Sequence, residues 1–354
     1  MKTAISSDRK TRKKLLLAVA ALFLFTIAGL GLWAKNGIFT PLSIHNTDRE
    51  VIFLIRRGQG LNDVAVDLAE TNLIKSPFLF KVAAVISHRQ SRLQAGVYNL
   101  SPSLSAWQIL RKIAAGDILK EKLTILEGWD VHDIANYLEQ KHIFSRDDFL
   151  LAAKSGDKEL QNIFDSESFL SFDFSGSNGY VPGLEGFLFP DTYEFIFGSS
   201  ISNFLREMLA NFKTKISDDL KAEIKRQGKS LYDVLIMASL LEKEVKTYSD
   251  KQVVAGILWK RLANGWPLQV DATINYALDK PNSKLSLDDL QFNSPYNTYI
   301  HKGLPPGPIC NPGMESIKAA VYYKESPYWY YLSKPNGATI FSTTFEQHKA
   351  AKAK

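Results

Sequence analysis

The segment Ser230–Lys246 has the sequence SLYDVLIMASLLEKEVK, and its apolar residues recur at helical spacing. Ser230 is a favourable N-cap residue, so we expect a helix to begin directly after it. When residues are placed at 100° intervals, Glu242 falls about 40° from Ala238, in the middle of the apolar side. Lys243 and Glu244 fall on the flanks or outside. The pattern therefore predicts a carboxylate on the face of the helix that should be buried.

A buried carboxylate allows two interpretations. Taking the ionised group out of water is costly, so the carboxyl group tends to keep its proton, as a general acid requires. Alternatively, Glu242 is structural and pairs with arginine, lysine or backbone donors where two helices meet. The helix alone leaves both interpretations open.

The N-terminus predicts a membrane segment. Residues 1–14 form a tail with six basic residues and one aspartate. Residues 15–34 carry no charge and are long enough to cross a ~30 Å hydrocarbon core as a helix. The basic tail should stay cytoplasmic, so the chain after Lys35 should be extracytoplasmic, on a single-pass anchor in the plasma membrane. A cleaved signal peptide is the alternative, although its apolar core is usually about 7–15 residues long.

Charge and cysteine content exclude some functions. The net charge of +6 lies mostly in residues 1–14, and the remaining 340 residues carry only +1. We therefore expect no nucleic-acid partner. Cys310 is the only cysteine, so there is no intrachain disulfide. The six histidines are scattered without an HExxH motif, and GxSxG, P-loop and dinucleotide motifs are absent. We expect no metal and no cofactor.

A self-comparison indicates how the rest of the chain is organised. Residues 35–50 are expected to form a tether. The segments beginning at Ile55 and Ile125 align with each other, and each predicts a short strand, a glycine turn and an amphipathic helix. Residues 51–119 resemble a LysM module, a family that binds N-acetylhexosamine chains. Any strand–turn–helix unit would share this pattern, which is the alternative.

Residues 120–354 are expected to form a larger mixed α+β domain. A second helix is predicted in KQVVAGILWKRLANG, ending near Gly265. The stretch 165–183 is predicted to be a loop or insertion. Tyr328–Ser333 has the aromatic character of a strand. The fold class is therefore α+β, with one transmembrane helix and a small LysM-like α/β module before the larger domain.

Three further motifs contain candidate site residues. EGFLFPDTYEF contains Glu185 and Asp191, while PLQVDATINYAL would place Gln269, Asp271 and Thr273 on one face if extended. The segment 293–313, NSPYNTYIHKGLPPGPICNPG, combines amides and hydroxyls with aromatic rings. Such groups suit a glycan, although the segment could also be a rigid loop. The candidates for substrate contact are Gln269, Asp271, Tyr296, Asn297, Glu185 and Asp191.

Five motifs in order, MASLLEKE, EGFLFPDTY, LQVDATINYAL, SPYNTY and GLPPGPICNPG, resemble the endolytic murein transglycosylases of the YceG-like (MltG) family. The resemblance covers nearly all of the chain after the anchor. It departs from the family at Ala272, where proline is usual, and at Val245, where threonine is common. It implies that Glu242, the first glutamate of EKE, is the single catalytic acid/base.

The resemblance also implies the reaction and the partners. A lytic transglycosylase (a lyase) would cleave the β-1,4 bond between N-acetylmuramic acid and N-acetylglucosamine within nascent peptidoglycan strands. It would leave 1,6-anhydromuramoyl ends and so limit strand length. Wall synthases such as penicillin-binding proteins are the protein partners that the resemblance suggests. The competing functions are a non-catalytic peptidoglycan-binding scaffold and a lysozyme-like hydrolase with a second carboxylate.

Overall fold

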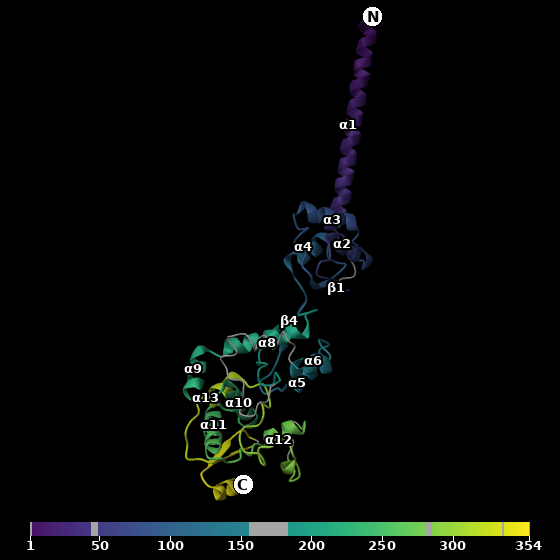
Figure 1. Ribbon diagram of the computed structural model, residues 1–354. Helices are drawn as coiled ribbons and strands as arrows, with labels where there is room; N and C mark the ends of the chain where they lie inside the picture. The colour runs from purple at the N-terminus through teal and green to yellow at the C-terminus, as the bar shows by residue number, and fades with distance from the viewer. Residues whose placement is uncertain (1, 44–48, 156–182, 281–284, 335, 354) are drawn as a thin grey trace. The chain divides into compact units, whose positions relative to one another are not determined.

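The computed structural model describes residues 2–43, 49–155, 183–280, 285–334 and 336–353. These residues form two compact units (Figure 1). The first comprises Met1–Glu121 with Ile196–Gly198, and the second comprises Lys122–Phe195 with Ser199–Lys354. Helices and short strands occur in both units, as the predicted α+β class requires.

The N-terminal helix α1 (Lys2–Phe39) contains one candidate membrane span, Leu16–Phe39. From Leu16 to Leu32 its side chains are exposed, as expected for a helix that needs an apolar surrounding. The helix continues beyond the predicted end of the span at Ala34 and includes the first residues of the predicted tether. Ile38 is buried, so this end of α1 packs onto the folded part of the first unit.

The folded part of the first unit follows a strand–helix–helix–strand order and ends with a third helix. Its elements are β1 (Val51–Ile55), α2 (Leu61–Glu70), α3 (Pro77–Ile86), β2 (Gly96–Leu100) and α4 (Ala106–Ala115). The two strands are antiparallel, with Val51 opposite Leu100. The predicted strand, glycine turn and amphipathic helix are confirmed, while the LysM-like character stays a prediction.

The described residues at the start of the second unit form elements in the same order. These are β3 (Lys120–Thr124), α5 (Val131–Gln140), α6 (Arg146–Ser155) and β4 (Thr192–Ile196), and β3 pairs with β4. The turns also match: Gly58 and Gly128 have φ values of 81° and 80°, in the left-handed region that favours glycine. The internal repeat is therefore structural. Most of the loop predicted at 165–183 lies outside the described residues.

A buried helix, α10 (Leu231–Glu244), forms the centre of the second unit. It contacts α9 (Asp218–Arg226), α11 (Tyr248–Ala263), α12 (Asp271–Ala277) and α13 (Met314–Val321). Between Leu231 and Leu241 every side chain except that of Asp233 is buried. A helix that is apolar on all sides needs neighbours on all sides, which explains its central position.

The remaining elements surround this core. They are α8 (Ile201–Lys215), a short 3-10 helix (Asp289–Gln291), β5 (Tyr330–Ser333), β6 (Thr339–Ser342) and α14 (Phe345–Lys352). The strand predicted at Tyr328–Ser333 begins two residues later and pairs with β6. α11 ends at Ala263, and Gly265 follows with φ 68°, so the predicted stop is confirmed.

The extended conformation considered for 267–278 is wrong. Gln269 has φ 55°, and α12 begins at Asp271. The backbone N–H of Gln269 donates to the carbonyl of Thr298, and that of Val270 donates to the hydroxyl of Thr298. These contacts hold the chain in a turn before α12. Gln269, Asp271 and Thr273 therefore do not share one face of a strand.

Candidate active site

Glu242 lies in the last turn of α10 and accepts three hydrogen bonds. The ammonium of Lys251, on α11, lies 3.1 Å from Oε1. The backbone N–H of Gly313 and the hydroxyl of Ser316 donate to Oε2 at 3.0 and 2.6 Å. The side chains of Glu242 and Lys251 are only 10% and 4% exposed. Glu242 thus joins α10, α11 and the start of α13.

These surroundings differ from the apolar environment that the helix pattern predicted. A lysine, a backbone N–H and a hydroxyl all stabilise the ionised form of a carboxylate. This is the pairing that the structural interpretation of Glu242 anticipated. A neighbouring proton donor is also what a carboxylate needs if it is to take up a proton during a reaction. The geometry therefore fits both interpretations, and only activity separates them.

A cavity of about 670 Å³ lies in the second unit, and its lining combines aliphatic side chains with three tyrosines. Tyr232, Tyr276 and Tyr296 line it together with Glu185 and His132. The rings of Tyr276 and Tyr296 lie 5.1 Å apart. Flat rings beside a few polar groups are typical of a small-molecule or sugar site.

Glu185 is the carboxyl group of this first cavity. Its Oε2 accepts from the N–H of Val131 at 3.1 Å and from the hydroxyl of Tyr276 at 3.3 Å, and its Oε1 accepts from Asn311 at 3.1 Å. Burial, and then the charge of Asp130, raise the pKa of Glu185 to about 8. Glu185 is therefore a carboxylic acid that keeps its proton at neutral pH.

A second cavity of about 630 Å³ has a lining rich in charged residues. Its carboxylates are Asp130, Asp133, Glu244, Asp271 and Asp279, and its amines are Lys243, Lys280 and Lys334. His132 and Tyr276 line both cavities, so the two adjoin. Together the two cavities offer one region lined by charged side chains and one region that contains aromatic rings.

Glu244 was predicted to lie on the flank of its helix or outside it. The structure places it, half-buried, in the wall of the second cavity. Burial, and then the charge of Asp271, raise its carboxyl pKa to about 7. The charge of Asp271 thus favours the protonated form of Glu244.

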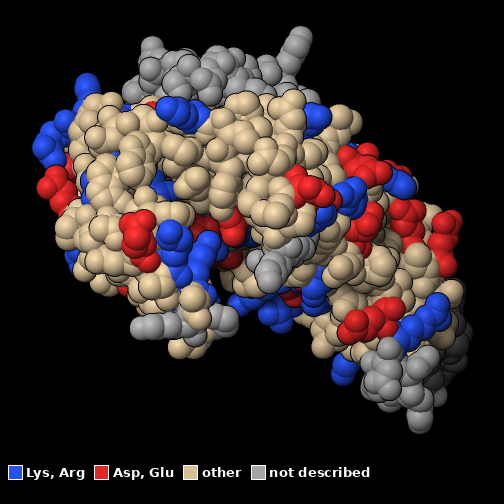
Figure 2. Space-filling model, turned by 90° about the horizontal axis from the view of Figure 1, so that it is seen from below, with Lys and Arg blue, Asp and Glu red and all other residues tan. Residues whose placement is uncertain are grey.

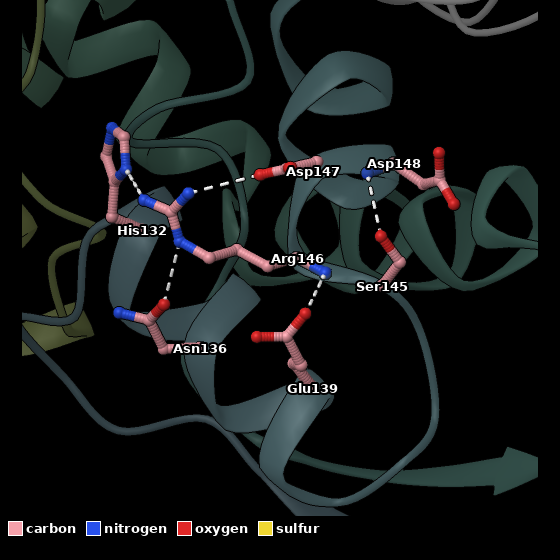
Figure 3. Close-up of polar contacts among 7 residues, drawn as sticks. All are labelled: His132, Asn136, Glu139, Ser145, Arg146, Asp147 and Asp148. Atoms are coloured by element: carbon pink, nitrogen blue, oxygen red, sulfur yellow. Dashed lines mark hydrogen bonds and ion pairs between the residues drawn. The ribbon is translucent and has the colours of Figure 1, made fainter.

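His132, at the junction of the cavities, is held by a polar network (Figure 3). The Arg146 guanidinium donates to Nδ1 of His132 at 3.4 Å and to Oδ1 of Asn136 at 2.9 Å, and it pairs with Asp147 at 3.2 Å. Because arginine can only donate, Nδ1 is the acceptor and the ring proton is on Nε2.

The predicted contact residues have different locations. Glu185 and Tyr296 line the first cavity, and Asp271 lines the second and accepts from the hydroxyl of Tyr299. Gln269 is exposed. Neither it nor Glu242 is part of the lining of these two cavities.

The other two candidates are engaged by the protein. Asn297 is fully buried, and its amide donates to the carbonyls of Leu290 and Phe292 and accepts from the N–H of Tyr299. It therefore holds its own loop in shape. Asp191 pairs with Lys215 at 2.9 Å and accepts from Asn211, and these contacts lower its pKa. Asp191 thus ties β4 to α8.

Several site residues were not predicted from the sequence: Lys251, Ser316, Glu244, Tyr276 and His132. Lys251 stands in the polar first turn of its helix, in the segment YSDKQ, so its sequence context gives no sign that it is buried. Nothing in the sequence marks His132 or Tyr276 either, which meet only through the fold.

The surface charges are mixed (Figure 2). Acidic and basic side chains alternate over the face that the figure shows, without a large area of one sign among the coloured residues. A polyanion such as a nucleic acid would require a basic stripe or patch. The face shown has no such stripe among its coloured residues.

Comparison with known proteins gives consistent matches. The model of the YceG-like family matches residues 53–354. A protein of Bacillus subtilis (strain 168) named endolytic murein transglycosylase is 31% identical over 93% of this chain and 90% of its own length. One of the same name from Streptococcus pneumoniae serotype 2 (strain D39 / NCTC 7466) is 28% identical over 86% of this chain and 58% of its own. The crystal structure of a yceG-like protein of Listeria monocytogenes has a TM-score of 0.57 at 30% identity, over 86% of this chain and 99% of that one.

Proposed function

The chain belongs to the YceG-like family, and we propose that it is an endolytic murein transglycosylase. The resemblance inferred from the five motifs is thereby confirmed. The observation that carries the proposal is the similarity to the Bacillus subtilis protein of that name. This similarity covers 93% of this chain and is therefore much more extensive than any single motif. Murein is then the substrate, and α1 anchors the enzyme as a single-pass helix with the remainder of the chain extracytoplasmic.

The adjoining cavities support a glycan substrate. At about 670 and 630 Å³, each is in the size range of a site for one or two sugar rings. In the first cavity, tyrosine rings offer flat apolar surfaces to the C–H faces of sugars. In the second, amines and carboxylates can bind hydroxyl, amide and lactyl groups. We propose that the two cavities hold sugar rings of the strand, which passes His132 and Tyr276, and that the bond to be cleaved lies beside Glu242, outside the lining of both cavities.

Glu242 is the proposed acid/base. Its proton goes to the oxygen of the glycosidic bond as the C1–O bond breaks and an oxocarbenium-like centre develops. The resulting carboxylate takes the proton of the C6 hydroxyl of N-acetylmuramic acid, and O6 bonds to C1. The products are a 1,6-anhydromuramoyl end and a free C4 hydroxyl on the neighbouring N-acetylglucosamine. No water is consumed, because an internal nucleophile has a high effective concentration.

Lys251 is the proposed source of the first proton. In the free enzyme the pair is a carboxylate and an ammonium 3.1 Å apart. When a glycan excludes water from the site, separated charges become more costly, and transfer of one proton from Nζ to Oε1 neutralises both groups. After the bond is cleaved, the proton from the C6 hydroxyl restores the neutral pair. Product release and rehydration then return the ion pair, so the cycle is balanced.

One observation favours a second candidate function, a lysozyme-like hydrolase. Glu185 keeps its proton at neutral pH and lines the aromatic cavity, as the acid of a hydrolase would. In that mechanism Glu185 would protonate the glycosidic oxygen, and an ionised carboxylate would activate water. Asp271, in the adjoining cavity, is the candidate for that carboxylate.

Product analysis distinguishes the two reactions. Purified peptidoglycan would be digested by the full-length enzyme in heavy-oxygen water, and the fragments examined by chromatography and mass spectrometry. A transglycosylase gives anhydro ends, each lighter than a reducing end by one water, and incorporates no heavy oxygen. Labelled reducing ends would instead identify the hydrolase, and an absence of cleavage would favour the wall-binding scaffold. An association with wall synthases is a further proposal, carried only by the resemblance.

A further inference from the structure

Helix α3 is apolar on both its faces. Leu79, Phe80, Ala83 and Ala84 are buried in the core of the first unit. On the opposite side, Phe78, Val85 and Ile86 are 60%, 53% and 74% exposed. Positions 78, 82, 85 and 86 share one side of a helix, so these residues form one patch together with Val82. A helix with two apolar faces indicates a second apolar contact outside the unit.

The end of α1 shows what that contact is. A span that begins at Leu16 fills a ~30 Å hydrocarbon core by about Lys35, which leaves Asn36–Phe39 in the interfacial layer. These are the residues that pack on the folded unit. Ile38 is buried. The backbone of α1 at Gly37 packs closely on Leu79 of α3, because a Cβ added at Gly37 would lie only 2.1 Å from a side-chain atom of Leu79. α3 therefore begins where the membrane ends, and Figure 1 shows it beside the end of α1.

Cationic and aromatic groups lie at the same level. The Lys75 ammonium donates to the hydroxyl of Thr40 at 2.6 Å, at the last turn of α1. The Arg89 guanidinium lies 5.1 Å from the ring of Trp107, and that ring lies 5.8 Å from the ring of Phe39. Tryptophan, lysine and arginine are the residues that favour the headgroup region of a bilayer.

We propose that the surface formed by Phe78, Val82, Val85 and Ile86, called here the α3 surface, inserts into the outer leaflet of the membrane that α1 spans. Its occupant is lipid, because the surface continues the apolar end of the span and is accompanied by cations at headgroup depth. The first unit is then fixed to the membrane by two elements and does not hang on a flexible tether. This inference requires the α1 anchor but not the proposed catalytic activity.

Depth-dependent quenching tests the proposal on the full-length protein in liposomes. In a Cys310→Ser background, single cysteines replace Ile86, Leu24 in the span, or Ile52, and each carries an environment-sensitive fluorophore. Ile52 is the matched control, because it is an apolar β1 residue of the same unit that is 61% exposed. Lipids brominated near the headgroup should quench the label at position 86 severalfold more than the label at position 52. Deeply brominated lipids should quench the label at position 24.

The outcomes separate the alternatives. Quenching at position 24 without quenching at position 86 would overturn the proposal while leaving the anchor intact. A second outcome is a blue-shifted, shielded label at position 86 that bromolipids do not quench. If this label becomes exposed when the protein is diluted in lipid, the surface contacts a second copy of the chain and the proposal is overturned. Quenching at position 86 that persists on dilution and weakens in a Phe78→Asp, Val85→Asp variant supports lipid contact.

Discussion

The ammonium of Lys251 lies 3.1 Å from Oε1 of Glu242, and both side chains are almost completely removed from solvent. The pair connects the end of α10 to α11, in the helix core of the second unit. A buried ion pair is weak evidence for stability, because the loss of hydration offsets the attraction. Retaining such a pair is more easily understood if one partner exchanges a proton during a reaction.

Replacing Lys251 by methionine should leave the Glu242 carboxylate buried without its counter-charge. We expect a loss of about 3–5 kcal/mol in the free energy of unfolding and at least a hundredfold loss of activity. Lys246→Met, at an exposed position, is the control and should be nearly neutral. Thermal unfolding and a glycan-cleavage assay provide the measurements.

Lys251→Arg separates the two roles of this side chain. Arginine keeps the positive charge but does not give up its proton in proteins. If Lys251 only holds Glu242 in place, the arginine variant should recover much of the activity that the methionine variant loses. If Lys251 supplies the proton, the arginine variant should be more stable than the methionine variant but equally inactive. Recovered activity would therefore refute the proton-transfer step.

Ser316→Ala should remove one of the two donors to Oε2 of Glu242. Ser316 is fully buried and donates at 2.6 Å, while the N–H of Gly313 remains. A hydrogen bond to a charged group contributes about 1.5–3 kcal/mol, so we expect kcat to fall about ten- to a hundredfold with little change in KM. Ser316→Thr, which keeps the hydroxyl, should recover activity if its methyl group fits. A rise in KM alone would contradict a positioning role.

The second unit should lose stability as the pH rises from about 4.5 to 8. The native carboxyl pKa of Glu185 is raised from 4.5 to about 8, so in this range the folded state binds a proton that the unfolded state has released. Glu244, at about 7, acts in the same direction. The melting temperature should therefore be lower at about pH 8.5 than at about pH 5.

Glu185→Gln is the matched variant for this pH dependence, because an amide resembles the protonated acid and does not titrate. The difference between wild type and variant should be small near pH 5 and should favour the variant near pH 8.5. The comparison of wild type with variant removes the contributions of other titrating groups, such as His348, to the pH dependence, because these groups are the same in both proteins. A wild-type protein that is relatively more stable at high pH would show that the Glu185 carboxyl is not held protonated.

Arg261 should be essential for the C-terminal hairpin. Its side chain is buried, and it donates twice to the carbonyl of Trp329 and once to that of Leu268. Arg261→Met should lower the free energy of unfolding by about 3 kcal/mol, since it removes the donors to the buried carbonyl of Leu268 and to the partly buried carbonyl of Trp329. Arg226→Met, on an exposed side chain, should change it by less than about 0.5 kcal/mol. Equal effects would contradict this account.

The local structure could be predicted because it depends on neighbouring residues. Ser230 accepts the N–H of Asp233 and begins α10, and Gly58 and Gly128 mark equivalent turns. The apolar segment of residues 15–34 became part of a helix of the expected kind. The conformation of 267–278 could not be predicted, because Thr298, far along the chain, sets the turn before α12.

The site was predicted only in part, for the same reason. Glu242 was found because a carboxylate interrupts an apolar pattern. Its partners Lys251, Gly313 and Ser316 come from other elements, and no spacing rule connects them to it. Asn297 looked like a sugar ligand by composition, yet its amide is needed for the backbone of its own loop. Side-chain type indicates what a residue can bind, whereas the fold decides which group it does bind.

The most direct test of the central claim is the digestion of peptidoglycan by Glu242→Gln beside the wild-type enzyme, with anhydromuramoyl ends counted by mass spectrometry. Glutamine keeps the volume and can still accept from Gly313 and Ser316, but it cannot give or take the proton. The wild-type enzyme should produce anhydro ends, and the variant should produce fewer by at least a hundredfold while remaining folded and bound to glycan. Anhydro ends formed by a folded variant at the wild-type rate would contradict the claim and leave Glu242 with a structural role.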